Sequence, residues 1–548
     1  MRRTSLALAT LALGALALPG LAPAHPERHS YYPNGTSGEN LSGSVPKYRS
    51  SYKPSSKKLG KRLVVCKGSA SRKRIHARLK GKQERRNLAL LKKCKYHDIQ
   101  HAVNKAQNNA RILVLPGVYE EKPSGAEPNP DPKCEGKYRV EGENVIGSYE
   151  YHRECPNSQN LIAIAGDGPD ADRKCDDKCN IQIEGTGRKA KDVLIKGERS
   201  KLNLIRADRA DGIYLRNFMV ELSDFNNIYA LETNGFVFDR IVSRYSREYG
   251  FLTFSSDNGL YTDLVAHGSG DSGIYPGSGP EGRCKRYGIE IRNSDSYENT
   301  IGYSGTAGNG IWAHDNKFHH NGTGMTTDSF AANHPGMPQD CAKFEKNQIY
   351  SNNENYFTEE RDEYCDISKR AVKDRDPKIV CPTFQVPVGT GIGIFGGNGN
   401  IIRDNYIYDN WRDGAKLVTI PAFLRGDDPT GQSDNDPANQ LDNPIDNAYT
   451  DNKMGYRPDG TRAPNGNDFW WDEGGRGNCW GGNLGSDGAP VSSNVLGGLP
   501  GCPRGGGLGA PNPAKSASQA TCATWDPQDE LLRDPPGCDW FTTPPKPR

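Results

Sequence analysis

Helix-type periodicity, leucine and long apolar segments are all scarce in this chain of 548 residues. No segment keeps apolar residues at the 3.6-residue spacing of an amphipathic helix over many turns, which excludes helical repeats. Leucine is too sparse for leucine-rich repeats. Beyond the first residues, no run approaches the ~20 apolar residues that a membrane helix requires. We therefore expect a protein built from strands and turns, without a membrane span.

Zinc-type cysteine pairs are also missing, because none of the fourteen cysteines belongs to a C-x-x-C motif. The closest pair, Cys175 and Cys179, lies in an acidic loop without a nearby histidine. The first residues indicate export, since two arginines precede a short apolar run that ends in an A-x-A sequence at Ala24. In an exported chain an even cysteine count favours disulfides. We predict a secreted protein, extracellular or associated with the cell wall, whose disulfide pairing the sequence leaves open.

Acidic residues nearly disappear from residues 47–95, which hold 19 lysines and arginines and one acid, Glu84. The whole chain has a net charge of only +3, so the remainder is acidic. Such a block commonly binds an anionic polymer. In an exported protein that partner is an anionic cell-envelope polymer or an acidic polysaccharide, and we expect no nucleic acid. The plainer alternative is a solvated, flexible arm.

What the chain does contain is a repeated phrase between residues 211 and 416: Asn or Asp, one residue, an apolar or aromatic residue, and then small polar residues. Copies lie 23 or 24 residues apart, or further apart where loops are inserted. Repeats of this length, with short apolar triplets between polar turns, are typical of a β-solenoid, whose coils bury their apolar faces on one another. Asn and Asp tolerate left-handed backbone and can bond to the next turn. We expect one turn column, formed by Asp239, Asp263, Asn293, Asn316, Asn347 and Asn405.

Residues 98–121, DIQHAVNKAQNNARILVLPGVYEE, combine a short amphipathic helix with an apolar strand. This phrase resembles the start of right-handed β-helix enzymes of the pectate-lyase-like superfamily, in which such a helix caps the first coil. The resemblance extends over about residues 87–420. It implies the fold but not the chemistry, because this fold hosts lyases, hydrolases, epimerases and non-catalytic adhesins. The segments MPQDC, IYSNN and DFWWDE resemble an exported right-handed β-helix family of actinobacteria.

We therefore predict an all-β fold, a right-handed parallel β-helix solenoid with an N-terminal capping helix and a disulfide-pinned C-terminal cap. The predicted divisions are a signal peptide (1–24), a basic disordered arm rich in Ser, Pro and Lys (25–86), the β-helix (87–420), an Asp/Asn/Gly-rich continuation or cap (421–488) and a Gly/Pro/Cys-rich tail (489–548). A single helix is expected within residues 87–108. Trp470, Trp471 and Trp480 should pack under the cap rather than stack on sugars.

Alternation along the strands suggests where chemistry could lie, because successive strand residues point inward and outward. With the isoleucines inside, the strand phrase GIEIR presents Glu290 and Arg292 to solvent. The phrase GIWAH presents Trp312 and His314, each 22 residues further on. Glu290 should then stack beside Trp312, and Arg292 beside His314. The same reasoning puts Tyr261 on the outside of the preceding rung.

This cluster suggests catalytic roles for Glu290, Arg292 and His314, and substrate-binding roles for Tyr261, Trp312 and His320. Arginine suits a carboxylate, aromatic rings suit a sugar face, and histidine moves protons near neutral pH. The alternative is that these are ordinary solvent-facing strand residues. Removal of a proton next to a uronate carboxylate needs such an arginine and histidine.

We therefore predict a monomeric protein that acts on an acidic, uronate-containing polysaccharide as a lyase or epimerase. The alternative is a non-catalytic envelope or carbohydrate-binding protein. A hydrolase ranks lower, because it needs two carboxylates about 5–10 Å apart and only Glu290 is evident here, with Asp315 a doubtful second.

Cofactor and motif signals are weak. The acidic loop of residues 167–177 offers oxygen ligands for calcium, but it lacks a recognisable ligand spacing, so a solvated loop is the favoured interpretation. Tyr249-Gly250-Phe251 resembles the start of the catalytic phrase of β-helix alginate epimerases, but Leu252-Thr253-Phe254 replaces the Asp-Pro-His that should follow.

Overall fold

A computed structural model describes residues 42–121, 134–141, 144–147, 151, 154–166, 175–280, 284–329, 334, 336–420, 444–492, 498–503, 509, 511–522 and 537–548. The predicted signal peptide, residues 25–41 of the predicted arm and most of the acidic loop lie outside these residues. So do residues 421–443, at the start of the predicted continuation or cap.

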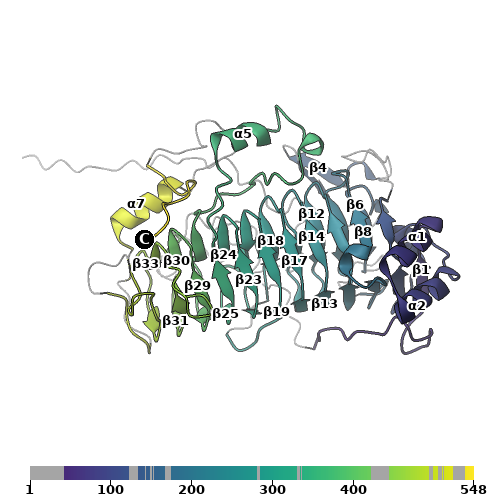
Figure 1. The fold of residues 1–548 in the computed structure, drawn as a ribbon, viewed down its shortest axis with the longest axis horizontal. Coiled ribbons are helices and arrows are strands. Elements are labelled where there is room, and N and C mark those ends of the chain that lie inside the picture. Colours follow the sequence, from purple (N-terminus) through teal and green to yellow (C-terminus); the bar gives the residue numbers. More distant parts are fainter. Residues whose placement is uncertain are drawn as a thin grey trace, which may run out of the picture.

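The chain winds into a right-handed parallel β-helix, as predicted. Each coil of the main body supplies one strand to each of three parallel sheets, which we call sheets I, II and III in the order in which a coil visits them. The coils stack along the long axis of the molecule (Figure 1).

Sheet I has 12 strands and sheets II and III have 10 each. Sheet I consists of β1 (Arg62–Val65), β2 (Arg111–Val114), β7 (Gln182–Gly185), β10 (Ile213–Arg216), β13 (Asn234–Asp239), β16 (Asp257–Thr262), β19 (Ile289–Arg292), β22 (Ile311–His314), β25 (Lys343–Glu345), β28 (Ile401–Arg403), β31 (Ala448–Thr450) and β34 (Cys479–Gly481). Sheet II consists of β3 (Gly117–Tyr119), β8 (Val193–Lys196), β11 (Met219–Glu221), β14 (Val242–Arg244), β17 (Val265–His267), β20 (Asp295–Tyr297), β23 (Lys317–His319), β26 (Gln348–Tyr350), β29 (Tyr406–Tyr408) and β32 (Lys453–Met454). Sheet III consists of β6 (Asn160–Ala165), β9 (Asn203–Asp208), β12 (Asn226–Leu231), β15 (Phe251–Phe254), β18 (Ser272–Gly277), β21 (Ile301–Tyr303), β24 (Thr323–Asp328), β27 (Thr390–Phe395), β30 (Asp413–Val418) and β33 (Asn467–Trp471).

The remaining elements are short. The helices are α1 (Ser69–Arg78), α2 (Gly81–Leu91), α3 (Ile99–Asn104), α5 (Glu359–Cys365), α7 (Pro513–Cys522) and the 3₁₀ turns η2 (Ala190–Asp192) and η3 (Val372–Asp374). Strands β4 (Tyr138–Glu141) and β5 (Asn144–Gly147) form a separate antiparallel hairpin. Figure 1 shows α1 and α2 at one end of the solenoid and α7 near the other.

Asparagines at the corners bond from coil to coil. The side chains of Asn316, Asn347, Asn405, Asn452 and Asn483 form a ladder in which each Nδ2 donates to the next Oδ1 at 2.9–3.1 Å. A second ladder joins Asn299, Asn321, Asn352, Asn410 and Asn465. Every one of these residues is buried except Asn483, which lies in the final coil and is partly exposed. The amides thus satisfy one another inside the solenoid, where water is excluded.

The predicted turn column was wrong in its first half, because it merged three neighbouring columns. Asp263 and Asn293 have positive φ angles of 55° and 51° and occupy the left-handed corner one residue before the ladder. Asp239 lies one residue earlier still, opposite Thr262 at the end of β13. In the coil of Asp263 the ladder position itself is Leu264, whose backbone N–H donates to the Ser294 hydroxyl in the following coil. The early coils therefore fill this corner with apolar side chains and the later coils with asparagine.

The predicted disordered arm is also wrong for residues 62–86, which fold as β1, α1 and the first part of α2. Lysines and arginines dominate the helices, yet Ile75 and Leu79 are completely buried. These side chains pack with Val64 and Leu113 on the outer face of sheet I. The Cys66–Cys94 disulfide links β1 to the segment after α2. Helical apolar spacing and a covalent link thus fold a segment whose charge alone suggested disorder.

The single helix expected within residues 87–108 is two helices, α2 and α3. The chain turns after Leu91 and then passes beside β1, where Tyr96 forms a parallel bridge with Val65. Helix α3 buries Ile99, Ala102 and Val103 in the main core. It packs against β1, β2 and β6 at the N-terminal end of the solenoid.

The solenoid continues past residue 420, since β31 to β34 extend all three sheets. Trp471 and Trp480 are 2% and 7% exposed and belong to the main core, as expected of tryptophans under a cap. Trp470 points outward from sheet III and lies over the ammonium of Lys416, 4.2 Å from the ring centroid. At the C-terminal end, the Cys479–Cys502 disulfide joins the last sheet I strand to the segment that covers it.

All fourteen cysteines form disulfides, which confirms that prediction. The pairs are Cys66–Cys94, Cys134–Cys155, Cys175–Cys179, Cys284–Cys341, Cys365–Cys381, Cys479–Cys502 and Cys522–Cys538.

Candidate functional site

The predicted register on sheet I is correct. Strands β19 and β22 pair in parallel with Glu290 opposite Trp312 and Arg292 opposite His314. The intervening Ile291 and Ala313 are completely buried, so the four polar side chains share the outer face. Their rungs lie ~4.8 Å apart.

Glu290 is the centre of this group. Its Oε1 accepts hydrogen bonds from Arg292 Nη1 at 2.8 Å and pairs with His314 Nε2 at 3.0 Å. On the other side of the imidazole, Nδ1 lies 2.6 Å from Asp315 Oδ2. The ring can donate to both carboxylates only as the imidazolium. The side chain of Arg292 is 40% exposed and that of His314 only 13%.

Trp312 does not present a free ring face. Its indole stacks on the His314 imidazole with centroids 4.2 Å apart and planes 26° apart. The Lys343 ammonium lies 5.0 Å from the ring centroid, and the indole Nε1 donates to Glu345 Oε1 at 2.8 Å. These contacts hold His314 in place rather than leave the indole open to a sugar.

The next two rungs add an ionic cluster that the sequence analysis missed. Glu345 accepts from Lys343 at 2.7 Å and from Arg403 at 2.7 Å, in addition to Trp312. Burial favours the neutral acid, but the hydrogen bonds from Lys343, Arg403 and Trp312 outweigh it, and the pKa of Glu345 is lowered. The signal was available, because Glu345 and Arg403 precede Asn347 and Asn405 by two residues, as His314 precedes Asn316.

Tyr261 is inside the solenoid, contrary to the prediction. It pairs with Ile291 in the register, and its side chain is completely buried. The absence of a side chain at Gly259 makes room for the Phe236 ring, which lies edge-on to Tyr261 at 5.6 Å. The Tyr261 hydroxyl bonds to Thr253 Oγ1 at 2.7 Å. The ring lies edge-on to Phe238 at 5.1 Å. A buried tyrosine with its hydroxyl satisfied is a stable core residue, so Tyr261 is unable to bind a sugar.

His320 is not part of the sheet I group either. It follows β23 on sheet II, has a φ of 53° and is exposed. Its Nδ1 lies 2.7 Å from His319 Nδ1. Of the six predicted residues, four therefore meet on sheet I, and Tyr261 and His320 lie elsewhere.

The N-terminal segment covers the first rungs of sheet I and leaves the group around Glu290 open. The Tyr48 hydroxyl donates to Glu184 at 3.0 Å, and the Arg216 guanidinium lies 4.2 Å from the Tyr48 ring centroid. Residues 42–54, which were predicted to be disordered, thus lie along the sheet. The segment reaches along the solenoid as far as Asn258, whose side chain lies close to Gly43.

The phrase that resembles an epimerase motif lies on sheet III. Leu252 and Phe254 point outward there and are buried in an apolar cluster with Tyr229, Tyr249 and Tyr275. Leu252 and Phe254 bear no titratable group, so they are unable to move a proton.

The described residues offer little for a metal. The one group of three candidate ligands among them is Cys66, Cys94 and His97. The two sulfurs form a disulfide and are not thiolate ligands. The predicted calcium loop lies mostly outside the described residues. None of the helices in the described part of the chain has the length and apolar content that a bilayer crossing demands.

Comparisons with known proteins reach the fold only. No protein-family model and no curated sequence matches the chain. Among solved structures, the periplasmic alginate epimerase AlgG is similar at 10% identity, with 69% of this chain and 68% of that chain covered and a TM-score of 0.38. The A-module of the Azotobacter vinelandii mannuronan C-5 epimerase AlgE6 is 13% identical over 72% and 91% of the two chains, with a TM-score of 0.37. The pectate lyase Pel9A is 12% identical over 74% and 76%, with a TM-score of 0.32. These values transfer no residue role, and the fold rests on the strand register described above.

Proposed function

We propose that the protein binds an acidic, uronate-containing polysaccharide along the open part of sheet I and acts on it by proton transfer, as a lyase or epimerase. The contact of Arg292, Glu290 and His314 on one exposed rung pair is the observation that carries the proposal. It joins a group that neutralises a carboxylate to a group that moves a proton.

The chemistry follows from what each reaction needs. The carbon next to a uronate carboxyl gives up its proton only if the resulting negative charge on the carboxylate is stabilised. Arg292 offers an exposed guanidinium fork for that carboxylate. Neutral His314, held through Nδ1 by Asp315, takes the proton at Nε2 once substrate displaces Glu290. In a lyase the C–O bond at the next ring carbon then breaks, a carbon–carbon double bond forms, and the leaving oxygen takes a proton from water. In an epimerase water on the opposite face returns a proton to the same carbon, and His314 later releases its proton to solvent.

Hydrolysis fits less well. It needs two carboxylates with the glycosidic bond between them. Here Glu290 and Asp315 both contact His314, so the imidazole fills the space between the two acids.

A non-catalytic, envelope-binding protein is the second candidate, and two observations favour it. Glu290 already neutralises Arg292 and engages His314 in the free protein. The cap formed by residues 53–95 also exposes many cations, and the described ion pairs use few of them. The exposed ones are Lys53, Lys57, Lys58, Lys61, Arg72, Lys73, Arg78, Lys80, Lys82, Arg85, Lys92, Lys93 and Lys95. Such a surface suits an anionic cell-envelope polymer. The seven disulfides support an extracytoplasmic location.

A panel of uronate polymers separates the two candidates. The protein is incubated with each polymer while unsaturated ends are followed by ultraviolet absorbance, chain cleavage by reducing sugar and epimer ratio by proton NMR. A lyase or epimerase produces unsaturated ends or a changed epimer ratio, and Arg292→Ala or His314→Ala lowers that rate by at least about 100-fold.

Arg403→Ala is the matched control, because it removes the same charge from the same outer column three rungs away. It should keep most of the activity. Full activity of Arg292→Ala and His314→Ala would show that sheet I is the wrong face. Binding without turnover, weakened by salt and by Lys92→Glu with Lys93→Glu, favours the non-catalytic candidate.

A further inference from the structure

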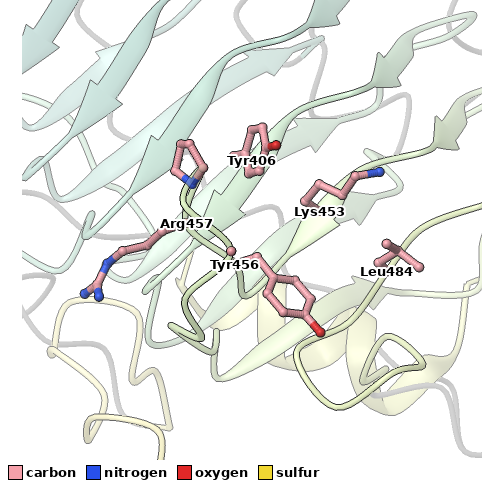
Figure 2. A pocket seen from close by; sticks show the side chains of 7 residues that line it. Tyr406, Lys453, Tyr456, Arg457 and Leu484 are labelled. Carbon is pink, nitrogen blue, oxygen red and sulfur yellow. The ribbon is translucent and has the colours of Figure 1, made fainter.

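A hollow of about 200 Å³ lies on the outer face of sheet II near its C-terminal end. Tyr406 of β29, Lys453 of β32, Tyr456 and Leu484 surround it, and the Arg457 side chain points away (Figure 2). Tyr406 and Lys453 are partners in the parallel register, so one rung separates the ring from the ammonium.

A row of stacked rings leads along sheet II to this hollow. His267, Tyr297, His319, Tyr350 and Tyr408 occupy one outer column, with centroids 4.7–5.3 Å apart and planes within 11° of parallel. Their faces cover one another, so the row offers only ring edges to a ligand. Tyr406 differs, because it lies in the adjacent column and belongs to no ring pair among the described residues.

A projecting loop of residues 456–462 forms one wall of the hollow and is well fixed. Tyr456 and Arg462 form an antiparallel bridge at its base, and the Tyr456 hydroxyl donates to Ser486 O at 3.3 Å. Arg462 also pairs with Asp487 at 2.6 Å. The wall is therefore held before any ligand arrives, which lowers the entropy cost of binding.

The hollow combines apolar surface with one available cation. Leu484 is 49% exposed, and Tyr406 and Tyr456 are partly exposed. Lys453 donates to the backbone oxygen of Asp451 at 3.2 Å. Within the described residues, no carboxylate lies within 4 Å of its ammonium. A ring with an apolar face and an acidic substituent complements this arrangement.

We propose that this hollow is a subsite for one uronate residue, stacked on Tyr406 or Tyr456 with its carboxylate at Lys453. The site would hold a polysaccharide on a second face of the solenoid, away from the proton-transfer group on sheet I. The substrate class rests on the proposed function, but the residues and the face are independent of it.

Calorimetric titration of the full chain with a uronate trisaccharide tests the subsite. Lys453→Gln should weaken binding about tenfold, the loss expected for one charge-assisted contact. Tyr406→Leu should weaken it several-fold through the lost ring contact. Lys317→Gln is the matched control, since it removes an exposed lysine from the same outer column three rungs away and should bind as wild type does. A trisaccharide with its carboxyls reduced to alcohols should bind wild type as weakly as the acidic one binds Lys453→Gln.

The outcomes separate this subsite from the sheet I proposal. Wild-type affinity in both Lys453→Gln and Tyr406→Leu overturns the subsite, whether or not Arg292→Ala abolishes turnover. Loss of binding in these two variants, with unchanged binding in Arg292→Ala and no turnover in any protein, establishes the subsite and removes the catalytic proposal. A wild-type protein that binds no uronate trisaccharide overturns the subsite as assigned.

Discussion

Sheets I and II are both parallel and have the same spacing between rungs, yet the side chains on their outer faces interact in different ways. On sheet I, long charged side chains reach along and across the rungs and pair at 2.6–3.0 Å. On sheet II, flat rings of successive rungs stack 4.7–5.3 Å apart. The ~4.8 Å spacing between rungs is close to the distance between stacked rings. Charged side chains pair at shorter distances, so they must lean towards one another along the sheet.

The difference matters for binding. An ion pair on sheet I can exchange a partner for a ligand carboxylate, because both states satisfy the charge. A stacked ring on sheet II gains nothing by leaving its neighbours. Ligands should therefore compete with existing pairs on sheet I and bind beyond the stacked row on sheet II.

Removing the charge of Glu345 from the ion pairs on sheet I should have the largest effect on stability. Glu345→Gln keeps the shape but removes the charge that Lys343 and Arg403 share, in a side chain only 5% exposed. We expect a loss of about 3 kcal/mol in unfolding free energy, because a nearly buried charge partner is removed. The measurement is the urea midpoint of unfolding.

Glu290→Gln is the control for that experiment. Its side chain is 27% exposed and solvent can replace its partners, so the loss should stay below about 1 kcal/mol. Equal losses in the two variants would mean that burial does not set the strength of the network.

Removing one ring from the sheet II row should cost somewhat less. Tyr350→Ala takes away stacking on His319 at 4.7 Å and on Tyr408 at 4.9 Å. Each aromatic pair contributes about 1 kcal/mol, so we expect a loss of about 2 kcal/mol in unfolding free energy. Gln348→Ala, on the same strand and face, should cost much less. A negligible loss in Tyr350→Ala would show that the stacked rings do not stabilise the fold.

The sheet II row should also show a pH dependence, which appears only on acidification. Burial, together with the nearby Arg244 charge, lowers the pKa of His267 to about 4, below the value of about 6.5 expected in the unfolded chain. The unfolded chain therefore binds this proton more readily. Its contribution to stability is present above pH 6.5 and is lost as the pH falls towards 4.

His267→Tyr keeps a ring in the row and does not titrate in this range. The difference in urea midpoint between wild type and His267→Tyr should therefore change between pH 6.5 and pH 4 in favour of the variant. A difference independent of pH would contradict the assignment.

The sequence sufficed for the fold and for much of the candidate site, because both depend on alternation and spacing. Equal spacing of 22 residues placed Glu290 beside Trp312 and Arg292 beside His314. It failed at Tyr261, because alternation from the apolar Leu260 puts the tyrosine outside, whereas its ring packs in the core against Phe236 and Phe238. The paired state of Glu290 depends on side-chain conformations, which no spacing specifies.

The prediction of disorder for the basic segment failed for a different physical reason. Charge density suggested disorder, but Ile75, Leu79 and the Cys66–Cys94 disulfide outweigh it. Deleting residues 47–95 would therefore expose apolar side chains at the N-terminal end of the core. Substitution of exposed lysines within residues 53–95 is the suitable test of whether this segment binds an anionic polymer.

The asparagine ladders make the cross-section of the solenoid independent of how much chain lies between coils. Asn316 and Asn347 are 31 residues apart and bond at 3.0 Å, whereas Asn347 and Asn405 are 58 residues apart and bond at 3.1 Å. The corner closes in the same way whether a coil is short or carries a long insertion. New segments can therefore be added at the loops during evolution without disturbing the neighbouring coils, so the surface of the protein can diversify while its framework stays constant.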